Sequence, residues 1–389
     1  MVSIDKALTI SILQDLVRID SVNPSLVPGA AGEAAIADYI AQLMHSWGLE
    51  VIDHELAPGR HNATGILRGS GGGRTLLFNG HTDTVSVAGM SEPFSGEVRD
   101  GRLYGRGSCD MKGSLAATLA ATHALLSGGR RLKGDVIFTY VADEEYASIG
   151  TEAIVAAIQS GELPRPDGAI NTEPTDLKLG IAHKGFVWLE VDTFGVAAHG
   201  SRPDLGIDAI AQMGKVLVEL SALQARLASG PRHALLGAGS VHASLIGGGR
   251  ELSSYPDRCR LQIERRTVPP ETGQGVRNEF GGILDHLAAD PAFKASGRVA
   301  FVRNPWQADL QSGVALTLGD VVAQRTGAPA QMKTETGWLD SALLGDAGIP
   351  TIVFGPRGEG RHAETEWVDC ESLAVCAQVY ADCMEHFCS

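Results

Sequence analysis

The sequence has little of what marks several protein classes. Its six cysteines show no Cys-x-x-Cys spacing, so they match no zinc-finger template. This scattered arrangement suggests a reducing environment. Lysine and arginine number 32 against 46 acidic residues, and the net charge of −14 argues against a nucleic-acid partner and an anionic membrane surface. No apolar run approaches the ~20 residues of a membrane span. The first residues lack a basic stretch followed by an apolar segment, so we expect no secretory signal and a cytoplasmic location.

The length and texture of the chain predict two domains. A chain of 389 residues exceeds what one hydrophobic core usually supports. Continuous apolar runs alternate with segments whose apolar residues have helical spacing, which is typical of an α/β domain with a mainly parallel sheet. The apolar runs are 75–78, 136–141, 169–170 and 351–354. The middle of the chain instead alternates in polarity, which suits a sheet with one solvated face. We therefore predict an α+β domain, 182–308, inserted into a catalytic domain formed by 1–181 and 309–389.

Acidic and histidine side chains follow several of these apolar runs. In open α/β sheets the carboxyl ends of the strands are where ligands bind, so these side chains should converge in one crevice. Two imidazoles and several carboxylates form a ligand set suited to a pair of zinc ions, and thus to a metal-assisted hydrolase. The candidates are His81, Asp110, Glu144, Glu145, Glu173 and His362.

Charge balance supports two ions. Two Zn²⁺ ions bring four positive charges, and Asp110, Glu145 and Glu173 bring three negative charges, so that one bridging hydroxide makes the cluster neutral. Glu144 has no metal role in this scheme. It is predicted to be the general base that takes a proton from the water and delivers it to the leaving nitrogen.

Each candidate also has an ordinary structural interpretation. His81 could be a loop histidine, although Asp83 is placed to fix the tautomer of a ligating imidazole. Asp110 could cap the helix predicted over 114–126. The other carboxylates could be solvated turn or loop residues, namely Glu144, Glu145 and Glu173. Their coincidence at one sheet edge favours the metal site over these separate interpretations.

Three segments resemble the signatures of a dinuclear zinc amidohydrolase family that includes acetylornithine deacetylase, succinyl-diaminopimelate desuccinylase, aminoacylases and glutamate carboxypeptidases. They are Gly-His-Thr-Asp-Thr-Val at 80–85, Gly-Arg-Gly-Ser-Cys-Asp-Met-Lys-Gly at 105–113 and Asp-Glu-Glu at 143–145. Segments 173–175 and 355–368 extend the match over nearly the whole chain. The resemblance implies one zinc held by His81, Asp110 and Glu173, and a second held by Asp110, Glu145 and His362, with Co²⁺ or Mn²⁺ as alternative ions. It also implies that Asp83 orients His81 and that Glu144 is the catalytic base.

The resemblance further implies that the inserted domain is a ferredoxin-like lid that forms a homodimer. His199 would reach the partner subunit's active site and stabilise the oxyanion, although it could instead be a loop histidine. Arg266 would bind the substrate carboxylate, although it could be a surface arginine. Ser253, Glu264 and the segment 337–340 depart from the pattern common among relatives, which leaves the acyl group open.

These observations predict a zinc-dependent hydrolase of N-acyl amino acids of the acetylornithine-deacetylase type. A dipeptidase, a carboxypeptidase or an N-succinyl desuccinylase is the alternative within the family, because peptide and N-acyl amide differ little for this chemistry. A non-catalytic metabolite-binding protein and a structural zinc protein are alternatives of other classes. The presence of Glu144 argues against pure binding, which needs no proton shuttle.

Overall fold

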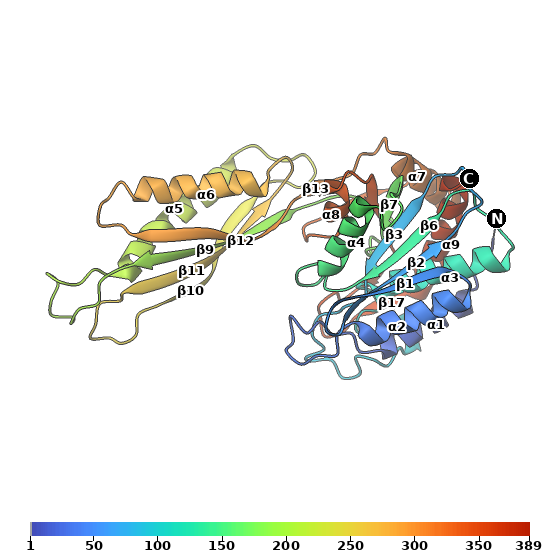
Figure 1. Cartoon of the computed structure of the whole chain (residues 1–389), viewed down its shortest axis with the longest axis horizontal. Coiled ribbons are helices and arrows are strands. Elements are labelled where there is room, and N and C mark those ends of the chain that lie inside the picture. Colours follow the sequence, from blue (N-terminus) through green and yellow to red (C-terminus); the bar gives the residue numbers. More distant parts are fainter. Residues whose placement is uncertain (1) are drawn as a thin grey trace. The chain divides into compact units, whose positions relative to one another are not determined.

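A computed structural model describes residues 2–389, which form two compact units (Figure 1). The discontinuous unit comprises the residues up to Ile181 together with Ala308–Lys333 and Leu339–Ser389. The inserted unit comprises Ala182–Gln307 and the short segment Thr334–Trp338. No pattern in the sequence indicates that this short segment belongs with the inserted unit.

The discontinuous unit is built on a mixed sheet. In spatial order its strands are β1 (Glu50–Ala57), β2 (Arg60–Leu67), β6 (Val136–Val141), β3 (Leu76–His81), β7 (Gly168–Asn171), β15 (Thr351–Val353) and β8 (Leu179–His183). The four central strands, from β6 to β15, run parallel to one another, whereas β1, β2 and β8 pair antiparallel. All six residues of β6 are buried, as expected for a strand covered on both faces. The predicted α/β class is confirmed, with its parallel strands at the centre.

Helices cover both faces of this sheet. Leu77 of β3 packs in one core cluster with α4 (Ile149–Ser160) and α8 (Ser341–Asp346). The next residue, Phe78, points to the opposite face, where its ring lies 5.1 Å from that of Tyr380 in α9 (Cys370–Phe387). The remaining helices of the unit are α1 (Lys6–Arg18), α2 (Ala34–Ser46), α3 (Lys112–Ser127) and α7 (Gly313–Thr326). The C-terminal cysteines are buried and free on or directly after α9.

A second, small antiparallel sheet belongs to the same unit. Its order is β16 (Gly358–Glu359), β17 (Trp367–Asp369), β5 (Arg102–Tyr104) and β4 (Val98–Arg99). Trp367 pairs with Tyr104, so segments far apart in sequence run side by side.

A short strand β14 (Met332–Glu335) pairs with β8 of the large sheet, and β13 (Trp306–Gln307) pairs with the last two residues of β8.

The inserted unit has the β-α-β-β-α-β order of a ferredoxin-like fold. Its antiparallel sheet has the order β10 (Ser240–Gly248), β11 (Arg258–Thr267), β9 (Gly185–Phe194) and β12 (Ala295–Arg303). Alternate residues of β9 and β11 form a core with α5 (Ala209–Ser229) and α6 (Gly273–Leu287). The alternation read from the sequence therefore reflects one covered face and one polar face.

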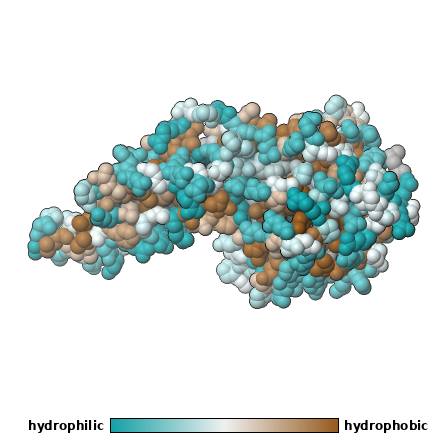
Figure 2. Space-filling model, turned by 45° about the horizontal axis from the view of Figure 1, so that its top comes forward, coloured by the Kyte–Doolittle hydropathy of each residue, from teal (hydrophilic) through white to brown (hydrophobic). Residues whose placement is uncertain are grey.

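The surface is mostly hydrophilic on the side shown in Figure 2, with hydrophobic residues in smaller patches between. Exposed hydrophobic side chains of the inserted unit include Val218, Leu245 and Leu252. Within residues 2–389, every helix is too short or too polar to cross a membrane.

Candidate metal centre

The central parallel strands bring the candidate residues of the discontinuous unit together. His81 is the last residue of β3, Glu144 and Glu145 follow β6 by a short turn, and Glu173 follows β7. These strands are parallel neighbours, so their carboxyl ends lie at the same edge of the sheet. Asp110 and His362 reach the same place from the two segments that border β5 and β17.

Asp110 lies between the two imidazoles. Its Oδ1 atom is 3.2 Å from Nε2 of His81, and its Oδ2 atom is 3.5 Å from Nε2 of His362. Oε1 of Glu173 lies 3.6 Å from Nε2 of His81, and Oε2 of Glu145 lies 3.0 Å from Nε2 of His362. The side chains thus divide into two groups that share one carboxylate.

The cap interpretation of Asp110 does not fit the structure. Helix α3 begins at Lys112, and its N-cap residue is Met111, with no side-chain cap bond. The Asp110 carboxylate is turned to the imidazoles instead. The predicted helix start at Ser114 was therefore two residues late.

Asp83 contacts His81 through its backbone as well as its carboxylate. Nδ1 of His81 lies 2.9 Å from the carbonyl oxygen of Asp83 and 3.5 Å from its Oδ1 atom. A ring nitrogen that donates to a carbonyl carries the proton, so Nε2, which faces the carboxylates, is the nitrogen that could bind a metal ion. The Asp83 carboxylate also accepts hydrogen bonds from the backbone N–H groups of Glu144 and Glu145, at 3.1 and 3.2 Å. Burial raises the pKa of Asp83, but the His81 and Asn23 side chains and the backbone N–H of Glu144 hold it below its usual range.

A buried polar network that we did not predict holds the turn before Glu144. Asn23 donates from Nδ2 to Asp83 at 2.8 Å and to Asp143 at 3.0 Å. Arg60 donates from Nη2 to the same oxygen of Asp143 at 2.6 Å, and its guanidinium also pairs with Glu33. Asp143 has a φ of +72°, a conformation that aspartate tolerates better than most residues. In the sequence, the Asn-Pro pair at 23–24 indicates a turn, but it does not indicate this network.

The carboxylates of this cluster are buried close together. Burial raises the pKa of Glu144, Glu145 and Glu173, that of Glu173 to about 8. Hydrogen bonds to Asp110 and Glu145 raise the pKa of His362 to about 10. Burial lowers the pKa of His81, but hydrogen bonds to Asp110 and Asp83 place it well above its usual value. Each of these shifts favours the protonated form of the group, which reduces the negative charge crowded in the cluster. Bound cations would reduce that charge in the same way.

The donor atoms fit metal ions. Ligands ~2.0–2.2 Å from a tetrahedral zinc ion lie about 3.3–3.6 Å from one another, and most of the separations given above are near this value. Two sets of three donors lie within 4.8 Å of one another, namely His81 with Glu144 and Glu173, and His81 with Asp110 and Glu145. Geometry alone therefore also allows Glu144 as a ligand, so its role as a base stays a prediction.

His199 and Arg266 belong to the inserted unit. His199 is exposed, and its Nδ1 atom lies 2.8 Å from the hydroxyl oxygen of Ser201. Arg266 is half-buried, donates from Nε to Glu264 at 2.7 Å and lies over the ring of Phe186 at 5.2 Å. A substrate carboxylate at Arg266 would compete with Glu264. The roles of His199 in stabilising the oxyanion and of Arg266 in binding the substrate carboxylate stay predictions.

Comparison with known proteins gives a consistent family. Residues 77–386 match the model of "Peptidase family M20/M25/M40". The acetylornithine deacetylase of Myxococcus xanthus is 32% identical over 84% of each chain. The succinyl-diaminopimelate desuccinylase of Methylocella silvestris is 28% identical over 97% of each chain. The crystal structure of the Bacillus subtilis YXEP protein, described as a dinuclear metal binding peptidase from this family, has a TM-score of 0.73, with 19% identity over 98% of each chain.

Proposed function

The chain belongs to peptidase family M20/M25/M40 and is a metal-dependent hydrolase of amide bonds, and we propose that it deacylates an N-acyl amino acid with two zinc ions. This membership confirms the resemblance inferred from the motifs. The proposal rests on the position of Asp110, with one oxygen toward His81 and the other toward His362. A carboxylate shared in this way suits two ions in one site better than one.

Each residue of the cluster has a separate proposed role. His81, Asp110 and Glu173 would hold one ion, and Asp110, Glu145 and His362 the other. The ions, when bound, would lower the pKa of water and polarise the scissile carbonyl. Glu144, next to these ligands and 9% exposed, would take the proton of the water and pass it to the leaving nitrogen. Its raised pKa suits a group that must both accept and donate.

We propose that His199 stabilises the oxyanion across a homodimer and that Arg266 binds the substrate carboxylate. The cytoplasmic location stays a prediction.

A substrate panel tests the proposed reaction. The zinc-loaded protein would be offered N-acetyl, N-succinyl and N-formyl amino acids, free dipeptides and acyl-glutamates, with the Glu144→Ala variant as the blank. We expect turnover of N-acetyl amino acids with one class of side chain. A preference for dipeptides would instead assign the protein to the peptidases of the family. Silence on every amide would contradict the proposal.

Metal loading should strengthen as the pH rises. In the metal-free protein, contacts with carboxylates raise the pKa of His81 and of His362, that of His362 to about 10, which favours the protonated imidazoles. Zinc binds only the neutral form. Each displaced proton should make binding about tenfold tighter per pH unit below the pKa. Calorimetry in two buffers of different ionisation enthalpy, between pH 6 and 8, would count the protons released. The exposed residue His386 provides the control His386→Ala, which should behave as the wild type. An affinity independent of pH would contradict this account.

A further inference from the structure

The loop that carries Asp110 turns its backbone N–H groups onto one buried carboxylate. Gly107 donates to Oε2 of Glu366 at 3.0 Å, while Cys109 and Asp110 donate to its Oε1 atom at 3.0 and 2.9 Å. Neighbouring N–H groups that converge in this way form an anion-binding concavity. Gly105 and Gly107 have φ values of +143° and +81°, which explains the Gly-x-Gly spacing of this loop.

Arg106 connects the same carboxylate to the segment that carries His362. Its Nη1 atom donates to Oε2 of Glu366 at 2.7 Å, and its Nη2 atom donates to the carbonyl of Ala363 at 3.0 Å. Arg106 and Glu366 are 2% and 1% exposed. Ala363 follows His362 directly, so one ion pair contacts the backbone beside both metal-ligand candidates.

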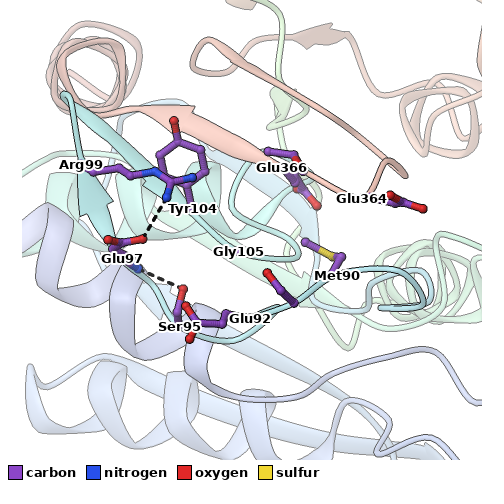
Figure 3. Close-up of a pocket in the computed structure, with 11 residues that line it drawn as sticks. Met90, Glu92, Ser95, Glu97, Arg99, Tyr104, Gly105, Glu364 and Glu366 are labelled. Atoms are coloured by element: carbon purple, nitrogen blue, oxygen red, sulfur yellow. Dashed lines mark hydrogen bonds and ion pairs between the residues drawn. The ribbon is translucent and has the colours of Figure 1, made fainter.

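The small sheet places these two segments opposite each other. The chain that leaves β5 leads to Asp110, and the chain that enters β17 comes from His362, while β5 and β17 are paired. The N–H group of Gly105 extends this pairing to the carbonyl oxygen of Glu366 at 3.2 Å. Figure 3 shows Glu366 and Glu364 on the segment entering β17, beside Gly105, in a pocket that these residues help to line.

We propose that Glu366, together with Arg106, is a positioning residue that fixes Asp110 relative to His362, and thereby maintains the ion that these two ligands would share. This inference rests on the two-ion centre proposed above. The Asp110–His362 separation of 3.5 Å leaves little tolerance, because ligand positions must be held within about 0.5 Å. Partners of metal ligands typically contribute 10–100-fold to metal affinity.

The Glu366→Gln variant tests the proposal. A glutamine amide keeps the shape but turns one acceptor into a donor, which must then face the N–H groups of the Asp110 loop or Arg106. We expect the ion shared by Asp110 and His362 to bind roughly 10–100-fold more weakly, and the other ion to bind nearly as in the wild type. Titration of the metal-free protein with Co²⁺ alone, followed by visible absorption, would measure both affinities without any substrate.

A matched control is Glu364→Gln, which removes a negative charge from the same loop at an exposed position. It should bind two ions as the wild type does. Arg106→Lys keeps the charge and leaves the backbone bonds to Glu366, so we expect a loss of only a few-fold, confined to the same ion. Circular dichroism would show whether each variant folds. If Glu366→Gln does not fold, the metal affinities of Arg106→Lys test the proposal instead.

The outcomes separate this inference from the proposed function. Wild-type-like binding in both the Glu366 and the Arg106 variant would overturn the positioning role. An equal loss in Glu364→Gln would also overturn it, because the effect would then be one of charge. A wild-type protein that binds fewer than two ions would instead refute the two-ion centre.

Discussion

A Glu144→Ala variant is expected to keep its fold and its metal ions and to lose turnover by about 10²–10⁴-fold, the usual effect of removing a general base. Oε2 of Glu144 lies 3.8 Å from Nε2 of His81, at the edge of the ligand cluster. The three predicted carboxylate ligands lie nearer to an imidazole, with Asp110 at 3.2 Å, Glu173 at 3.6 Å and Glu145 at 3.0 Å. Rates on the preferred substrate of the panel, with metal content by mass spectrometry, would check this result.

The neighbouring residue provides the contrast. Glu145→Ala should lose an ion, because Oε2 of Glu145 lies only 3.0 Å from Nε2 of His362. The two variants remove the same group one position apart, so general disturbance of the turn should affect both alike. Metal loss from Glu144→Ala with metal retained in Glu145→Ala would exchange the two roles.

The sequence predicted the parts of the site that depend on strand ends. His81, Glu144 and Glu173 each follow a buried apolar run, and parallel strands place such residues at one edge whatever the connecting segments do. The inserted unit was also recognisable, because its strands alternate in polarity where those of the main sheet do not. Both signals are local and periodic, which is why a single sequence shows them.

The supporting contacts could not be predicted in the same way. Arg106 and Glu366 are 260 positions apart, and nothing in either segment indicates which buried arginine meets which carboxylate. Arg60 and Asp143 are likewise joined across 83 positions. Such pairs depend on the tertiary fold and not on any local period. The glycines at 105 and 107 gave a partial signal, which we assigned to a family motif and not to an anion-binding loop.

Asp110→Asn should have the largest effect on metal binding, because one carboxylate faces both imidazoles. The substitution keeps the shape of the side chain but removes its negative charge. It also replaces one carboxylate oxygen with an NH₂ group, which donates hydrogen bonds and does not bind a metal ion. We expect the affinity for both ions to fall by more than about 100-fold, beyond the effect typical of a partner outside the ligand shell. After dialysis the variant should hold less than one ion per subunit and show no turnover above the metal-free blank.

The neighbouring ligands show whether Asp110 is truly shared. Glu173→Gln should weaken mainly the ion on the His81 side, and His362→Ala the ion on the other side, since each contacts only one of the two groups described above. A double variant, Asp110→Asn with His362→Ala, should be no worse than Asp110→Asn alone, because groups that act as one unit lose their effect together. If Asp110→Asn released a single ion and the double variant released the second, then Asp110 would serve one ion only. A two-ion centre would then need a bridging group other than Asp110.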